Sequence, residues 1–407
     1  MKNDNNSEIS RRTVLHAVAA STGSTTALSQ TQRVVAQPTE TPPLDSSPWP
    51  MKHGNPQGTS SVASEHAPTT RVLSEKWSSQ VAGGDGLQPI VSKQGLVVAT
   101  GRPMITATSL NLDTGQQQWK AQVDETTHAS PVAEAENILF ISEQGLASRE
   151  GSSGKSASRT SVPRDAFLFV DLIATQGQIL FASKTGVVGA IGPNSTGINW
   201  ETRVDDSYRP AGIVVDDDTV YVAAIELNED GSKRSGRVYA LNASTGSTRW
   251  VRTIPSGARE IAVAAGTVVV GTVSRVHALK ADSGDHHWDV KTATETPRFS
   301  ITQDSVVIGG YRQLATVALS TGEPLWTTDF DSDRITPTIG GDTVYAAGSG
   351  DEGTNWKAQL KSISITDGSV NWSRSIDENR LHGPAIANGS LFISTDVGQV
   401  YAFNGGD

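Results

Sequence analysis

The sequence predicts an all-β protein, an eight-bladed β-propeller with four-stranded blades. A phrase with a glycine turn and a tryptophan four residues later recurs along the chain. Short apolar runs separated by Gly, Asp and Asn turns fill the space between these phrases, and none keeps a helical period. The tryptophans recur about every 42 residues, a spacing typical of propeller blades.

The phrase predicts a docking contact between blades. Full copies read LNLDTGQQQW, LNASTGSTRW, LKADSGDHHW, VALSTGEPLW and ISITDGSVNW, a short copy reads GPNSTGINW, and a degraded copy, EGSSGKSAS, ends at Ser158. Glycine allows the positive φ of the turn, and the Thr, Ser or Asp before it can bond the turn backbone. We expect the tryptophans to be buried between neighbouring blades. They are Trp77, Trp119, Trp200, Trp250, Trp288, Trp326 and Trp372.

The two ends of the repeat region predict a closed ring. The chain stops at 400–407, a phrase cut off before its tryptophan, while an outer strand with Trp77 stands at the start. The N-terminal strand should therefore complete the last blade and leave no open sheet edge. Eight tryptophan slots give eight blades. The alternative is seven blades, if the slot at Ser158 is not a blade.

The first 70 residues divide into two segments that precede the propeller of residues 71–407. Residues 1–36 contain Ser10–Leu15, which resembles a twin-arginine export motif, and a short apolar stretch. The alternative is a disordered tail with a chance arginine pair. Residues 37–70 are rich in Pro, Ser, Thr and Gly and predict a linker. Its island at 48–59, PWPMKHGNPQGT, either lies against the propeller by burying Trp49 or is an unstructured tether.

Composition excludes several classes of site. The chain has no cysteine, which excludes disulfides, thiolate metal sites and a lipid-anchored cysteine. Its net charge is −10 without a basic stripe, which argues against nucleic-acid partners. No apolar run is long enough to span a membrane. We expect an exported monomer, extracellular or at the cell envelope and not a lipoprotein.

The repeated phrase A-x-D-x-x-T-G-x-x-x-W resembles the tryptophan-docking motif of the pyrroloquinoline quinone (PQQ)-like β-propeller family, over residues 72–407. The resemblance implies either a quinone-dependent dehydrogenase or a non-enzymatic scaffold of the BamB type. The dehydrogenases carry a vicinal disulfide, a calcium ion, a catalytic Asp and longer chains. Because this chain has no cysteine and few insertions, neither PQQ nor calcium is expected as a cofactor. The BamB-type scaffold is a lipoprotein, whereas this chain has no cysteine to lipidate.

Candidate metal ligands are few. The acidic clusters at 216–218 and 329–333 are expected to be solvated turns, because neither has the spacing of a calcium loop. His286 and His287 should alternate between the two faces of a strand, so we expect no metal shared between them. No catalytic residue is assigned.

One pattern predicts a binding site. Basic residues precede or begin most inner strands, near one mouth of the central channel, where they would focus a positive field on an acidic protein. The alternative is a set of rim residues paired with nearby Asp and Glu. The candidates are His128, Arg209, Arg259, Arg298, Arg334 and His382.

The sequence therefore predicts an exported, non-catalytic propeller that binds an envelope or extracellular protein, or a small anionic ligand, on this funnel face. One alternative is a quinone-dependent dehydrogenase-like enzyme. The other is an extracellular protein that binds sugars or peptides.

Overall fold

The computed structural model describes residues 47–406, except 85, 102–104, 124–128, 143, 164–165, 167–168, 176, 193–196, 228–232, 293–296, 351–356 and 379. All described residues belong to one compact unit, residues 41–407. Within these residues, no helix has the length and apolar character that would let it cross a membrane.

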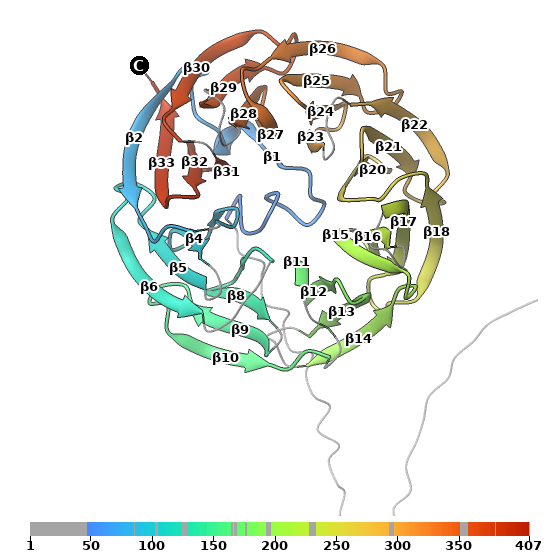
Figure 1. The fold of residues 1–407 in the computed structure, drawn as a ribbon. Helices are drawn as coiled ribbons and strands as arrows, with labels where there is room; N and C mark the ends of the chain where they lie inside the picture. The colour runs from blue at the N-terminus through green and yellow to red at the C-terminus, as the bar shows by residue number, and fades with distance from the viewer. Residues whose placement is uncertain are drawn as a thin grey trace, which may run out of the picture. The chain divides into compact units, whose positions relative to one another are not determined.

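Eight antiparallel sheets form the eight blades (Figure 1). Blade 1 is β3 (Ile90–Val91), β4 (Leu96–Thr100), β5 (Ile105–Leu110) and β6 (Gln117–Val123). Blade 2 is β7 (Val132–Glu134), β8 (Asn137–Ser142), β9 (Gly145–Glu150) and β10 (Ser156–Thr160). Blade 3 is β11 (Phe169–Thr175), β12 (Gln178–Ser183), β13 (Val187–Ile191) and β14 (Ile198–Arg203). Blade 4 is β15 (Tyr208–Asp216), β16 (Thr219–Leu227), β17 (Lys233–Asn242) and β18 (Thr248–Ile254).

The second half repeats this order from the inner to the outer strand. Blade 5 is β19 (Glu260–Ala264), β20 (Thr267–Thr272), β21 (Arg275–Lys280) and β22 (His286–Lys291). Blade 6 is β23 (Arg298–Ile301), β24 (Ser305–Gly309), β25 (Gln313–Ala318) and β26 (Pro324–Asp329). Blade 7 is β27 (Asp333–Gly340), β28 (Thr343–Ser349), β29 (Ala358–Ser364) and β30 (Val370–Ile376). Blade 8 is β31 (Leu381–Ala387), β32 (Ser390–Thr395), β33 (Gln399–Gly405) and β2 (Leu73–Gln80).

The ring closes through the N-terminal strand, as predicted. β2 pairs antiparallel with β33 from Leu73 opposite Gly405 to Gln80 opposite Gln399. Inner strands of neighbouring blades contact each other around the whole ring, including β31 with β3. Blade 2, which carries Ser158 in place of tryptophan, is a complete four-stranded sheet. The eight-bladed fold is confirmed and the seven-bladed alternative is excluded.

Six docking tryptophans donate the indole N–H to a carbonyl in the turn of the following blade: Trp77, Trp119, Trp200, Trp250, Trp288 and Trp326. Trp372 packs against Phe403 of blade 8. Trp200 Nε1 of blade 3 donates to the Ala243 carbonyl of blade 4 at 2.8 Å, and Trp288 Nε1 of blade 5 donates to the Leu319 carbonyl of blade 6 at 2.7 Å. The glycine of the receiving turn has a positive φ, as at Gly284 with +69°. Six phrase glycines thus lie against the tryptophan of the preceding blade: Gly115, Gly154, Gly246, Gly284, Gly322 and Gly368. Gly197 follows the blade that has Ser158 and meets no tryptophan.

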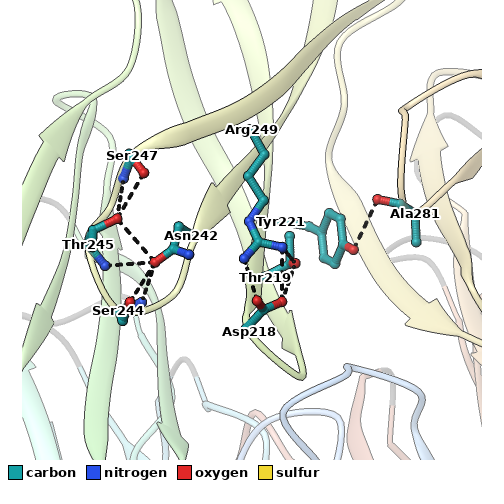
Figure 2. A network of polar contacts seen from close by, with 9 residues as sticks. All are labelled: Asp218, Thr219, Tyr221, Asn242, Ser244, Thr245, Ser247, Arg249 and Ala281. Carbon is teal, nitrogen blue, oxygen red and sulfur yellow. Dashed lines mark hydrogen bonds and ion pairs between the residues drawn. The ribbon is translucent and has the colours of Figure 1, made fainter. Parts of the chain in front are cut away.

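Side chains at the start of the phrase hold the turn in shape (Figure 2). Asn242 Oδ1 accepts the backbone N–H groups of Ser244 and Thr245, both at 3.0 Å. In the next blade, the Ala281 carbonyl accepts both Trp250 Nε1 at 3.0 Å and the Tyr221 hydroxyl at 3.2 Å. These bonds satisfy polar groups that the turn would otherwise leave unpaired between blades.

A β-bulge precedes the tryptophan position in every blade. In blade 5, Trp288 pairs with Ala278 but His286 pairs with Leu279, so His287 is an extra residue on the outer strand. The same one-residue register shift occurs in the other seven blades, including blade 2, where it precedes Ser158. A bulge interrupts the two-residue alternation of side chains, so residues on either side of it can share a face.

Residues 49–66, here called the belt, lie inside the ring of inner strands (Figure 1). Their carbonyls accept backbone N–H groups of blades 1, 2, 4, 5, 6, 7 and 8: Trp49 O from Val91, Pro50 O from Ala133, Pro56 O from Val215, Gln57 O from Val263, Thr59 O from Ile301, Ser60 O from Ile339 and His66 O from Gly389. The belt also contains β1 (Ser61–Val62), parallel to β27, and the 3-10 turn η1 (Ser64–His66). It therefore covers the inner strand edges that a propeller leaves unpaired.

The belt is anchored by apolar side chains as well as backbone bonds. Trp49 is fully buried, and Met51 is 1% exposed within the packing of blades 2, 3 and 4. This part of the segment predicted as a linker thus lies against the propeller and buries Trp49, which was the first of the two alternatives for the island.

Candidate functional site

A cavity of about 550 Å³ lies over the belt at the ends where inner strands begin. Its walls come from the starts of β23, β27 and β31, from 86–88 ahead of β3 and from Ser130 ahead of β7, and belt residues contribute to it as well. This is the channel mouth that the sequence predicts as a binding face. Lys52 and His53 are the belt residues that line it.

Cationic side chains dominate the charged lining of the pocket. Three are supplied by inner strands or the residues before them: Arg298, Arg334 and Arg380. Lys52 and His53 come from the belt, and His382 comes from β31. Arg334 is exposed, has a φ of +46° and lies at a bulge between Asp333 and Ile335. Such a bulge redirects a side chain that regular pairing would place elsewhere.

Glu260 organises the cations on one side of the pocket. Its side chain is 7% exposed; Oε1 lies 3.0 Å from His53 Nε2, and Oε2 accepts from an Arg298 guanidinium nitrogen at 2.5 Å. Burial alone would raise the pKa of Glu260, but Arg298 and His53 outweigh it and hold the pKa below its usual range. This carboxylate thus fixes a belt residue and a blade residue in one geometry.

Two further carboxylates contact Lys52, Arg380 and His382. Asp171 Oδ1 of β11 lies 3.2 Å from Lys52 Nζ. Asp396 lies 2.5 Å from His382 Nε2 and 3.7 Å from an Arg380 nitrogen. The Lys52–Asp171 pair also ties the belt to blade 3.

The charges around the pocket do not cancel. Among the described residues, Lys52, Arg298 and Arg380 pair with three carboxylates, those of Asp171, Glu260 and Asp396, and Arg334 adds a fourth positive charge. Among the described acidic residues, none forms an ion pair with Arg334. Two histidines add positive charge when protonated. The pocket is therefore cationic in a protein whose net charge is −10.

The structure brings three of the six predicted funnel-face residues together. Arg298, Arg334 and His382 line the pocket. Arg209 begins the inner strand of blade 4 and is exposed, and Arg259 is half-buried ahead of β19, but neither contributes to the pocket lining. His128 lies outside the described residues.

Lys52, His53 and Arg380 belong to the pocket and are missed by the sequence reasoning. The sequence signal for Lys52 and His53 lies in the island at 48–59. Burial of Trp49 places this island, and with it the Lys-His pair, against the propeller. Nothing in the sequence tells which blade the island faces. Arg380 stands two residues before His382, ahead of the same inner strand.

A second group of polar side chains lies on blade 5. Ligand atoms of His277, His286 and Asp289 lie within 4.8 Å of one another, the one such grouping found among the described residues. In the acidic turn at 216–218, Asp218 is exposed and pairs with Arg249 on the same blade (Figure 2).

Comparison with known proteins identifies related sequences and folds. The family model described as outer membrane protein assembly factor BamB matches residues 9–251, 184–274 and 273–379. Among curated proteins, no sequence matches.

Several solved structures share the fold. BamB from Moraxella catarrhalis is 14% identical with a TM-score of 0.61, covering 82% of this chain and 98% of that one. A quinohemoprotein alcohol dehydrogenase from Comamonas testosteroni is 11% identical with a TM-score of 0.68, covering 88% and 81%. A europium-containing methanol dehydrogenase is 11% identical with a TM-score of 0.66, covering 88% and 98%. At such identities the likeness establishes the fold alone.

Proposed function

The chain belongs to the family described as outer membrane protein assembly factor BamB, and on that premise we propose that it is a non-catalytic module that binds an acidic segment of a partner protein. The observation that carries the proposal is the cationic pocket over the belt, with its excess of positive charge in an acidic protein. Carboxylates bind arginine through charge-assisted hydrogen bonds. A cavity of about 550 Å³ accommodates a few side chains of such a segment.

The pocket is suited to a partner's side chains because it is preorganised. The Glu260, Asp171 and Asp396 carboxylates already hold most of the cations in place, so fewer side chains have to be ordered on binding. Arg334 is exposed and has no described acidic partner, which makes it the group most available to an incoming carboxylate. The twin-arginine-like N-terminus is consistent with a partner at the cell envelope or outside the cell.

The quinone-dependent alternative fits this pocket poorly. Calcium requires oxygen ligands, but the three carboxylates around the pocket are each paired with a cation. The charged groups that line the cavity are basic, including Lys52 of the belt, and therefore repel Ca²⁺. The chain also has no cysteine for a vicinal disulfide. We therefore assign no reaction step to a quinone.

The test is binding of a fluorescently labelled oligoglutamate peptide to the purified chain. We expect saturable binding that weakens with salt, and a loss of about tenfold or more in the Arg334→Ser, Arg380→Ser double variant, since each charge contact contributes about 1 kcal/mol. Arg209→Ser is the matched control, because this exposed arginine also begins an inner strand but does not line the pocket. Equal affinity of the double variant and the unmodified chain would refute the proposed site.

Two further measurements address the partner and the alternative. Capture from an envelope extract with the unmodified chain, set against the double variant, should recover a protein that requires the two arginines. Titration with PQQ and Ca²⁺ together should give neither bound quinone absorbance nor dye-linked dehydrogenase activity. Turnover in that assay would replace the binding proposal with an enzymatic one.

A further inference from the structure

The outer half of blade 5 carries a group of side chains that the proposed binding function does not use. His277 lies on β21, and His286 and Asp289 lie on the adjacent strand β22. His277 pairs directly with Asp289, whereas His286 pairs with Leu279 on the far side of the bulge. In a regular strand, residues three apart point to opposite faces. The bulge at His287 removes this alternation and lets His286 and Asp289 meet.

His277 has an unsatisfied ring nitrogen. The residue is 4% exposed, and its Nε2 has no hydrogen-bond partner among the described residues. A buried polar group without a partner costs about 1–3 kcal/mol, so it calls for an explanation. A metal ion bound by this nitrogen would supply the missing partner. The neutral imidazole is the form that binds metal ions.

The other two members leave the group open to solvent. His286 Nε2 lies 3.2 Å from Asp289 Oδ1, with side chains 55% and 27% exposed. Arg275 contacts the other carboxylate oxygen, Oδ2, which fixes the orientation of Asp289. A hydrogen-bonded carboxylate ligand is typical of metal sites, although the guanidinium charge weakens the attraction for a cation.

The internal repeat shows that the propeller does not require these residues. Three positions in each blade are equivalent to His286, Asp289 and His277. They are the second residue before the tryptophan position, the residue directly after it, and the residue of the third strand that pairs with this last residue. In blade 4 they are Thr248, Val251 and Tyr239, and in blade 7 they are Val370, Ser373 and Lys361. Among the eight described bulges, blade 5 alone has His, Asp or Glu at all three positions.

We propose that His277, His286 and Asp289 bind a divalent metal ion of the zinc type. Two imidazoles and one carboxylate with an open position match the ligand set of three-ligand zinc sites, whereas calcium and magnesium prefer oxygen ligands alone. The ligand atoms lie within 4.8 Å of one another, against about 3.3 Å around a zinc ion with bonds of roughly 2.0–2.2 Å. His286 Nε2 and Asp289 Oδ1 already lie 3.2 Å apart, so metal binding requires mainly that His277 and this pair approach each other.

The test is zinc titration by calorimetry of the untagged full chain after treatment with EDTA. We expect one site that is weakened at least about tenfold by His286→Asn and by His277→Gln, since even outer contacts of a metal site change affinity by that factor. His287→Asn is the matched control, because this neighbouring histidine is the bulged residue outside the group. His286 is exposed, so its variant should fold even if His277→Gln does not.

Cobalt provides a second readout. Co²⁺ bound by the unmodified chain should give a visible absorption band that His286→Asn abolishes and His287→Asn retains. The proposal is overturned if the unmodified chain binds no zinc, if His286→Asn binds it as tightly, or if His287→Asn loses as much affinity as His286→Asn.

Discussion

His53 Nε2 lies 3.0 Å from Oε1 of Glu260, and this contact joins the belt to the inner strand of blade 5. The other oxygen of the same carboxylate accepts from Arg298 of blade 6. One buried anion therefore connects three separate parts of the chain. Because it also sets two of the cations in the pocket, its replacement should affect both stability and ligand capture.

We expect Glu260→Gln to lower the free energy of unfolding at neutral pH by about 2 kcal/mol, the range for hydrogen bonds to charged groups. Arg298 and His53 hold the pKa of Glu260 below its ordinary value of 4.5. Its stabilisation is therefore fully present above the unfolded-state pKa and is lost as the pH falls through the folded-state pKa. The difference between the two proteins should narrow below about pH 4.5. Urea unfolding at several pH values measures it.

Glu201→Gln is the control for this experiment, because Glu201 is exposed on the outer strand of blade 3. A surface substitution of this kind should change stability by less than about 0.5 kcal/mol. A constant difference between Glu260→Gln and the unmodified chain from neutral to acid pH would show that the ion pairs do not supply the stabilisation.

The docking glycines can be tested within a single blade. Gly284 and Gly266 have φ values of +69° and +70°. A Cβ on Gly284 would lie 2.6 Å from the Trp250 ring, whereas one on Gly266 would meet nothing within 4 Å. Gly284→Ala should therefore destabilise by about 1–3 kcal/mol more than Gly266→Ala, since the backbone strain is shared and only the overlap differs. Thermal or urea unfolding of both variants measures this, and equal losses would mean that the ring moves aside freely.

The fold was predictable because its cause is local and repeated. Each phrase contains its own turn glycine, a polar residue that bonds the turn and a tryptophan for the next blade, so the sequence repeats the whole docking contact. The bulge before Trp288 was not predictable, because it shows only in the strand register. Regular alternation predicts that His286 and Asp289 point to opposite faces of the strand. The bulge removes this alternation, so the grouping of His286, Asp289 and His277 could not be predicted.

The pocket was predictable only in part. Arg298, Arg334 and His382 share a position relative to the repeat, so the periodicity placed them at one mouth of the channel. Arg209 and Arg259 have similar positions but do not line the cavity. Lys52 and His53 come from a segment outside the repeat. Their position depends on long-range backbone bonds of the belt, which have no periodic signal in the sequence.

Trp49 should be a principal anchor of the belt. Its side chain is fully buried, and its carbonyl accepts the Val91 N–H at 2.8 Å. We expect Trp49→Ala to lower the free energy of unfolding by about 3–5 kcal/mol, as for other buried tryptophans. Trp49→Phe keeps most of the apolar volume and should lose considerably less. If both substitutions proved neutral in urea unfolding, the belt would not contribute to the stability of the ring.

Substitutions at Lys52 and Asp171 can distinguish the structural role of the belt from its role in binding, because Lys52 Nζ contacts Asp171 Oδ1. Asp171 is 6% exposed, so Lys52→Met leaves a carboxylate nearly buried without its partner and should destabilise by about 2 kcal/mol or more. Adding Asp171→Asn should restore part of this loss, with a coupling energy of about 1–2 kcal/mol in a double-mutant cycle of urea unfolding.

Binding should respond differently, because Asp171→Asn alone keeps the Lys52 charge and removes a competing anion. Affinity for the oligoglutamate peptide should then fall in Lys52→Met and hold or rise in Asp171→Asn, whereas parallel losses in both variants would mean that the pair acts on the fold and not on the ligand.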